Sequence, residues 1–426
     1  MAEARTLMPP SALGAPSPTT PPSLVLAVVI AFFATCPVLL HLFATYVADG
    51  NSFADTGGGT CAALALAGLA ALRIGLPLRE LGAMHGPTLA LACIAGLFWS
   101  HWILLNVLSP SPQAQMANLP IQGVLWLSLP MLLCFLWRNA IDMAQLARVA
   151  IVLSAVYIIA LTGRFVLGLG HYQSGRWHPG DALESIRAGH YAGSALWIFL
   201  VACVCPARLV PGWFKLVAFV SIPLAAFMVV ATNSRGPALS LAATILCTSV
   251  PLAKILAGRI SRDARLLVVL LVGVSVTALF IASQLGSVES DFARMTTLTR
   301  DGGSAQTRVT LWQDHMQLIS DTPWGVISGF GYDHGLFYPH NVLIEALVDG
   351  GVLSFGLALG MIFVALRAWF APRLRGDELT LLFGGIFIFD LIGSQVSGSI
   401  PIDSTWYGAL LLVLRHEEVS ERRGYR

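Results

Sequence analysis

The stretch LVAFVSIPLAAFMVVATNSRGPALSLAATILCTSVPLAKILA, residues 216–257, decides the fold. It is apolar almost throughout and too long for one membrane-crossing helix, which needs about 20 residues. Its central polar break is Thr232-Asn-Ser-Arg-Gly236. We therefore predict two membrane spans joined by almost no loop, with Arg235 at the membrane surface between them.

The whole chain shares this apolar character. Of its 426 residues, 56% are hydrophobic and only 11% are charged, and the mean hydropathy is +0.74. Soluble domains carry roughly 25% charged residues. Lipid must be the solvent for most of this chain, which predicts an all-α polytopic integral membrane protein. The net charge of +2 gives no strongly basic surface, so we expect no nucleic-acid partner.

Twelve apolar segments are candidate transmembrane helices. They lie near residues 24–46, 59–76, 87–108, 119–137, 148–168, 189–205, 213–232, 236–257, 265–284, 351–370, 379–396 and 403–415. With both chain ends in the cytoplasm, most of the 25 basic residues fall on the cytoplasmic side, as the positive-inside rule requires. The arginines left on the periplasmic side are Arg164, Arg176, Arg187, Arg235, Arg294, Arg300 and Arg308.

The spans divide the chain into five parts. Residues 1–22 are rich in Pro, Ser, Thr and Ala and should form a disordered cytoplasmic tail. Residues 23–284 hold transmembrane helices 1–9, and residues 285–340 form a large periplasmic loop, a length that usually carries function. Residues 341–415 hold a short helix, stopped by Gly350-Gly351, and transmembrane helices 10–12. Residues 416–426 form a cytoplasmic tail.

Three residues are candidates for chemistry at the periplasmic surface. Arg235 is a charge at a break between spans, where it faces a cavity or extends to lipid phosphate. Arg308 follows Thr307, a plausible N-cap, so it either helps an anion site at a helix start or is a solvated loop residue. His340 precedes a helix, so it either acts as a neutral general base or caps that helix.

Further polar and aromatic residues could bind a sugar or phosphate. The loop around residues 169–191 is dense in them, although Trp and Tyr also collect at membrane interfaces. The candidate substrate-binding residues are Arg164, Trp177, Arg187, His190, Tyr191, Tyr338 and Asn341. The roles of Glu345, a rival base, and of the intramembrane acid Asp390 stay open.

The large loop contains a helical pattern. Val309, Trp312, Met316 and Ile319 recur at helical spacing and predict one face of an amphipathic helix, lying on the membrane or over a cavity. The sequence holds no metal-binding motif such as HExxH or an acidic triplet. We therefore expect neither a metal nor a cofactor.

Four motifs in a fixed order resemble the signature of a known family. They are Asn233-Ser-Arg-Gly236, Arg308-Val-Thr-Leu-Trp312, Gly329-Phe-Gly331, and His340-Asn341 followed by Glu345 and Gly350-Gly351. Together they resemble the bacterial O-antigen ligase family, whose signature region also occurs in O-antigen polymerases and pilin oligosaccharyltransferases. The short C-terminus argues against a pilin oligosaccharyltransferase.

The resemblance implies a GT-C-like glycosyltransferase of the bacterial inner membrane. Such an enzyme transfers a glycan from undecaprenyl pyrophosphate to lipid A-core oligosaccharide at the periplasmic face, in lipopolysaccharide biosynthesis. The reaction is inverting and metal-independent. Arg235 and Arg308 would then bind the donor pyrophosphate, and His340 would be the base. An O-antigen or exopolysaccharide polymerase is the alternative. A lipid-linked sugar flippase or transporter is a second alternative, although the charges of such a protein should be spread along a central path across the membrane.

Overall fold

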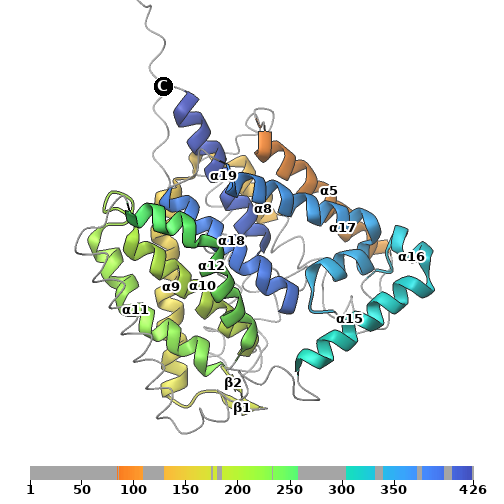
Figure 1. The fold of residues 1–426 in the computed structure, drawn as a ribbon, viewed down its shortest axis with the longest axis horizontal. Coiled ribbons are helices and arrows are strands. Elements are labelled where there is room, and N and C mark those ends of the chain that lie inside the picture. Colours follow the sequence, from red (N-terminus) through yellow and green to blue (C-terminus); the bar gives the residue numbers. More distant parts are fainter. Residues whose placement is uncertain are drawn as a thin grey trace, which may run out of the picture.

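The computed structural model describes residues 84, 86–108, 129–173, 176–179, 185–232, 234–257, 304–331, 339–371, 377–397 and 405–424. This part of the chain is almost entirely helical (Figure 1). Its longer helices are α5 (Gly86–Leu108), α9 (Met143–Val166), α10 (Ser185–Val204), α11 (Gly212–Ala231), α12 (Arg235–Ala257), α15 (Ser304–Asp321), α17 (Val342–Trp369), α18 (Glu378–Ser397) and α19 (Thr405–Gly424). The short elements are α8 (Leu129–Leu136), the 3-10 turn η2 (Arg138–Ala140), α16 (Pro323–Ser328), and the antiparallel strands β1 (His171–Gln173) and β2 (Arg176–His178).

Six of the described helices are long and apolar enough to cross a membrane. They are α5, α9, α10, α11, α17 and α18. Each corresponds to one of the expected spans, near residues 87–108, 148–168, 189–205, 213–232, 351–370 and 379–396. The prediction of an all-α polytopic membrane protein is therefore confirmed, because only helices can satisfy their own backbone hydrogen bonds in lipid.

The remaining expected spans differ or lie outside the described residues. Helix α12 fills the expected span 236–257, although its apolar part, Gly236–Leu252, is shorter than the others. The expected span 403–415 becomes α19, which continues through most of the expected C-terminal tail. Of 119–137, the structure describes only the end, including α8. The expected spans 24–46, 59–76 and 265–284 and the tail 1–22 are outside the described residues, so a total of twelve stays a prediction.

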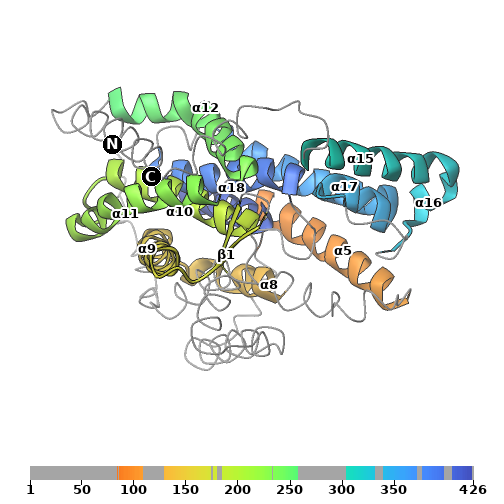
Figure 2. The ribbon, with the colours of Figure 1, turned by 90° about the horizontal axis from the view of Figure 1, so that it is seen from below.

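Helices α10 and α18 form the centre of the bundle. Helix α10 packs on α9, α11, α12 and α18, and α18 also packs on α19. Figure 2 shows α12 and α9 on opposite sides of this pair. The face of α10 is built from the small residues Ala188, Gly189, Ala192, Gly193 and Ala195, all buried. Small side chains allow helix backbones to approach closely, which replaces the missing hydrophobic drive between helices in lipid.

Helix directions separate two ends of the bundle. At one end Arg415, in the middle of α19, pairs with Glu418 and with Asp377, whose oxygen lies 2.9 Å from its Nε. Arg148, near the start of α9, donates to the Leu209 carbonyl at 2.8 Å. Arg164, Arg187 and Arg235 lie at the other ends of their helices. The structure thus groups these basic residues as the topology predicts, and which end faces the periplasm stays a prediction.

Helix α17 is broken as expected, at Gly351. This glycine has φ 66° and ψ −168°, values that end the helix locally and free the carbonyls before it. The backbone N–H groups of Phe330 and Gly331 donate to the carbonyls of Val348 and Asp349, at 2.8 and 3.0 Å. A ring nitrogen of His101 lies 3.0 Å from the Gly350 oxygen. Hydrogen bonds from the Gly329–Gly331 segment and from His101 therefore stabilise the break in α17.

Helix α15 confirms the predicted loop helix but corrects its start and its faces. It begins at Ser304, a turn before Arg308, because Ala305 and Gln306 are good helix formers. Thr307 is therefore not the N-cap, and Arg308 lies in the second turn rather than at the free N-terminus. The expected stripe is also divided: Trp312 and Ile319 are half-buried, whereas Val309 and Met316 are exposed. The inward face centres instead on His315, which is fully buried.

Candidate active site

His340 lies just before α17, and Asn341 separates it from Val342, the first residue of that helix. The residue that caps this helix is Asn341, whose side-chain oxygen accepts from the backbone N–H groups of Leu343 and Ile344, both at 3.0 Å. This capping bond satisfies helix N–H groups that would otherwise lack a partner. The capping role considered for His340 therefore belongs to its neighbour.

The backbone on both sides of His340 is fixed by long-range hydrogen bonds. The indole N–H of Trp312, on α15, donates to the carbonyl of Pro339 at 2.8 Å. The side-chain amide of Asn341 donates to the carbonyl of Gln395, near the end of α18, at 3.0 Å. Between these two anchors His340 has φ 55°, the left-handed conformation that costs a non-glycine residue roughly 1–2 kcal/mol. Two helices thus hold this histidine in a strained position.

Arg308 lies within electrostatic reach of two histidines. Its positive charge acts on both His340 and His190. Burial, and after it this charge, lowers the pKa of His340 from 6.5 to about 4. The imidazole of His340 is therefore neutral at physiological pH, as a general base must be.

His190, on α10, brings the third helix to the site. Its ring packs edge-on against Phe389 of α18, with ring centroids 5.8 Å apart. A Cβ placed on Gly393 would lie 2.4 Å from Cε1 of His190 and 3.3 Å from the Ser240 hydroxyl oxygen, so only glycine fits there. Its Nε2 is buried and has no hydrogen-bond partner among the described residues.

Arg235 begins α12 next to the same part of α10. Helix α11 ends at Ala231 and is capped at Thr232, so the predicted near-absence of a loop is confirmed. A Cβ on Gly189 would lie 2.7 Å from the Thr232 hydroxyl oxygen. The turn between α11 and α12 therefore packs against the residue that precedes His190. The side chain of Arg235 is outside the described residues. The N-terminus of α12 itself offers free N–H groups and a positive dipole end, both favourable for an anion.

The segment that carries these residues matches one protein family. Residues 219–359 match the family model described as O-antigen ligase. This part of the chain is an O-antigen ligase domain. The match covers Arg235, Arg308 and His340, so the resemblance inferred from the motifs is confirmed. The matched segment is similar to the O-antigen ligases and polymerases. A search of curated proteins finds no match to the chain.

Two of the predicted binding residues, Arg164 and Trp177, are buried beside the β1–β2 hairpin. Arg164 is buried, and its Nε donates to the Pro179 carbonyl at 2.9 Å. Trp177 is buried against Phe165, with ring centroids 5.1 Å apart. These contacts hold the β1–β2 hairpin on the end of α9. We infer that both residues support the hairpin, and the sequence could not separate this role from binding.

For the other predicted binding residues the structure gives less detail. Tyr191 is half-buried and packs edge-on against Tyr157, with ring centroids 5.8 Å apart. Arg187 is half-buried one turn before it on α10. Tyr338 lies outside the described residues.

Two residues have positioning roles that the sequence did not reveal. Trp312 was seen only as part of an amphipathic face and of a family motif, and Gln395 only as part of a span, yet both position the backbone around His340. Asn341 bonds the backbone carbonyl of Gln395, so no side chain in the sequence could have signalled this contact.

Acidic residues near the site are buried. Glu345, the rival base, is fully buried one turn into α17, whereas Asp390 is half-buried in α18. In the described part of the chain, no group of three or more His, Cys, Asp or Glu is arranged to hold a metal ion.

Proposed function

We propose that this protein is an O-antigen ligase of the bacterial inner membrane. It transfers a glycan from undecaprenyl pyrophosphate to the lipid A-core oligosaccharide at the periplasmic face, in lipopolysaccharide biosynthesis. The observation that carries the proposal is that the charge of Arg308 on α15 acts on His340, while Trp312 of the same helix bonds the residue before His340. Both lie inside a segment that matches the O-antigen ligase family.

His340 is the general base in the proposed reaction. A hydroxyl of the acceptor sugar attacks the anomeric carbon of the donor, while its proton passes to the neutral imidazole. The bond from that carbon to the pyrophosphate oxygen breaks, and undecaprenyl pyrophosphate leaves with the bonding electrons. Attack from the face opposite the leaving group inverts the anomeric configuration. A positioned base contributes roughly 10²–10⁴-fold to such a step.

Arg308 and Arg235 bind the pyrophosphate in this proposal. Negative charge develops on the leaving oxygen, and fixed guanidinium groups stabilise it most in a site with little water. A guanidinium also fits phosphate through two parallel hydrogen bonds. We further propose that His190, Arg187, Tyr191, Tyr338 and Asn341 line the surrounding substrate site, with Asn341 acting through the backbone.

The position of Arg308 links donor binding to the strength of the base. In the free enzyme its charge disfavours protonation of His340. A bound pyrophosphate offsets that charge, which is the smaller of the two causes that lower the pKa of His340, so the imidazole becomes a stronger base when the donor is in place.

Reconstitution with defined substrates tests the proposal. The purified protein, in vesicles, is given undecaprenyl-pyrophosphate-linked glycan together with lipid A-core oligosaccharide, and products are separated by gel and mass spectrometry. A glycan joined to lipid A-core, formed also in the presence of a metal chelator, is the expected result. Lengthened glycan on the carrier from donor alone identifies a polymerase instead. Movement of donor across the vesicle membrane without any new bond identifies a flippase, and either result overturns the ligase proposal.

A further inference from the structure

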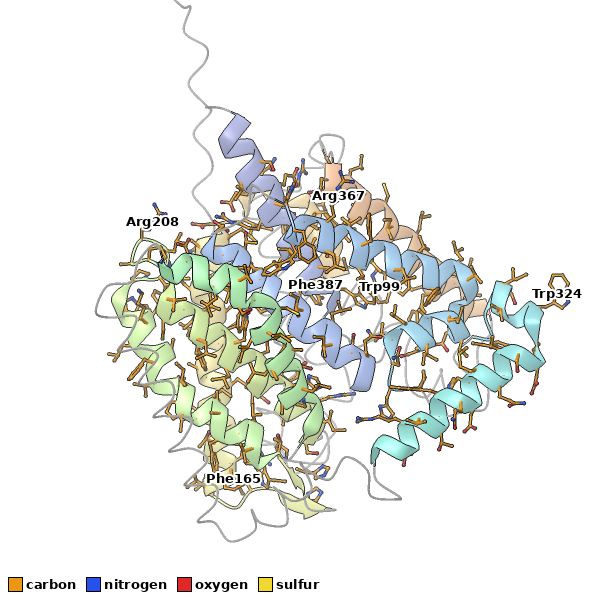
Figure 3. The ribbon with its side chains drawn as sticks, viewed as in Figure 1. Trp99, Phe165, Arg208, Trp324, Arg367 and Phe387 are labelled. Atoms are coloured by element: carbon orange, nitrogen blue, oxygen red, sulfur yellow. The ribbon has the colours of Figure 1, made fainter. Side chains whose placement is uncertain are left out.

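Helix α16 has one face packed on the protein and one face that carries large apolar side chains into the open. Its inner face contains Gly325, where a Cβ would lie 2.1 Å from the ring of Phe330. On the outer face, Trp324 is 80% exposed and Ile327 is 61% exposed. Figure 3 shows Trp324 pointing away from the body of the protein. Two such side chains in water would be unfavourable, because burying them stabilises a protein.

This apolar face is continuous with the lipid-facing surface of α17. The backbone of α16 packs on the break in α17: a Cβ on Gly351 would lie 2.5 Å from the Ile327 carbonyl oxygen. The next two residues of α17, Val352 and Leu353, are each 53% exposed. From the break to Trp369, α17 has a length of roughly 27 Å at 1.5 Å per residue, close to the thickness of a bilayer core of about 30 Å. Helix α16 therefore lies level with the point where α17 enters the hydrocarbon.

We propose that α16 is an anchor in the membrane interface, with Trp324 and Ile327 inserted among the phospholipids of the leaflet on the active-site side. Tryptophan is enriched at this depth because its ring is apolar and its N–H remains near water. A second copy of the chain is a poorer occupant. A stable interface buries about 800 Å² per partner, more than two side chains on a helix of this length provide.

The anchor would fix the height of the active site relative to the bilayer. Only Thr322 separates α15 from α16, and Arg308 and Trp312 project from α15. If the proposed function is correct, this arrangement fixes the height of α15, and with it of Arg308, relative to the phosphates of a lipid-linked donor. The anchor itself can be tested without any activity measurement, so its failure would leave the proposed function untouched.

Spin labels on single cysteines measure the depth directly. The protein without its native cysteines is labelled at Trp324→Cys or Ile327→Cys and reconstituted in vesicles of phosphatidylethanolamine and phosphatidylglycerol. Leu353→Cys is the lipid-facing control, and the matched aqueous control is Gln317→Cys, on an exposed polar position of neighbouring α15. Accessibility to oxygen, which concentrates in lipid, is compared with accessibility to a water-soluble nickel chelate.

The labels at positions 324 and 327 should be several-fold more accessible to oxygen relative to nickel than the label at 317, and closer to the label at 353. Nickel accessibility equal to that at 317 would overturn the anchor. Low accessibility to both reagents, with strong dipolar coupling between labels at 324, would show that a second copy covers this face, and would also overturn it. Thermal unfolding of each labelled variant confirms that the fold is retained, and a variant that fails this check is replaced by the other of the pair.

Discussion

The indole N–H of Trp312 donates a hydrogen bond to the carbonyl oxygen of Pro339 across 27 residues of sequence, at 2.8 Å. This bond joins the helix that carries Arg308 to the backbone that carries His340. The base and the cation of the proposed reaction are thus fixed relative to each other by a third residue that need not touch the substrate. We regard Trp312 as a positioning residue. Loss of a positioning residue lowers kcat without lowering stability, whereas loss of a packing residue lowers stability.

Replacing Trp312 by Phe keeps an aromatic ring but removes the N–H. We expect kcat to fall roughly tenfold, because small displacements of a catalytic group are costly, while KM for the donor and the thermal unfolding temperature change little. Trp213→Phe, at an exposed position on α11, is the matched control and should behave as wild type. An unchanged kcat, or a fall that simply follows lost stability, would argue against the positioning role.

Replacing His340 by Asn separates chemistry from folding. Asparagine tolerates the left-handed conformation of this position, so thermal stability should be kept or slightly raised. Ligation should fall by roughly 10²–10⁴-fold, since the base is gone. Turnover should be measured on the same preparation as unfolding and donor binding. A variant with near-normal turnover would exclude His340 as the base.

The pH dependence of the reaction should reflect the lowered pKa of His340. Below its pKa the imidazole is protonated and cannot accept a proton, so kcat/KM should fall only as the pH approaches about 4 rather than 6.5. The acid limb of kcat, which describes the enzyme with donor bound, should lie at higher pH because pyrophosphate offsets the charge of Arg308. Samples returned to neutral pH must regain full activity. An acid limb of kcat/KM near 6.5 would contradict the assignment.

The same shift affects stability with a definite sign. Because the folded state holds the proton of His340 more weakly than the unfolded state, this residue destabilises the fold as the pH falls from about 6.5 to about 4. His340→Asn should remove that part of the acid sensitivity, which thermal unfolding at pH 7 and pH 5 can measure.

Arg308→Lys keeps a positive charge but loses the planar fork. We expect kcat/KM for the donor to fall roughly 10- to 100-fold, because charged hydrogen bonds to phosphate each contribute about 1.5–3 kcal/mol. Arg235→Lys should act in the same direction. Arg208→Lys, exposed at the opposite end of the bundle, is the control and should leave activity unchanged. Wild-type kinetics in both site variants would rule out pyrophosphate binding by these arginines.

Substitution of Asp377 tests the ionic cluster of Asp377, Arg415 and Glu418, which lies at the end of the bundle away from the site. Burial alone raises the pKa of Asp377, but the hydrogen bonds and charge of Arg415, with bonds from Thr380, outweigh burial and lower it below the usual value. The pair therefore stabilises the fold above the normal carboxyl pKa and loses this effect in acid. Asp377→Asn should cost about 1–2 kcal/mol at pH 7, since Arg415 keeps Glu418, and should spare activity below the unfolding temperature. An equal unfolding temperature for the two proteins would show that the pair contributes nothing.

The sequence was sufficient for the six spans found among the described residues and for the short turn before Arg235, because the requirement for apolar length leaves few alternatives in lipid. It also predicted the break at Gly350-Gly351. It misplaced the start of α15, because a threonine can either cap a helix or lie inside one, and Thr307 lies inside. The contacts of Trp312 with Pro339 and of Asn341 with Gln395 depend on how helices far apart in sequence pack, and local pattern carries no such information. For the same reason the burial of Arg164 and Trp177 beside the hairpin could not be predicted from the sequence.

The left-handed backbone at position 340 has a consequence for how mutations here would fare under selection. A library of all residues at this position, screened only for the amount of folded protein in the membrane, should enrich Gly and Asn, which adopt φ 55° at little cost. The same library, screened for glycan displayed on the cell surface, should return His alone. The two rankings would differ most at this position, because here the conformation that the fold demands and the side chain that the reaction demands favour different residues.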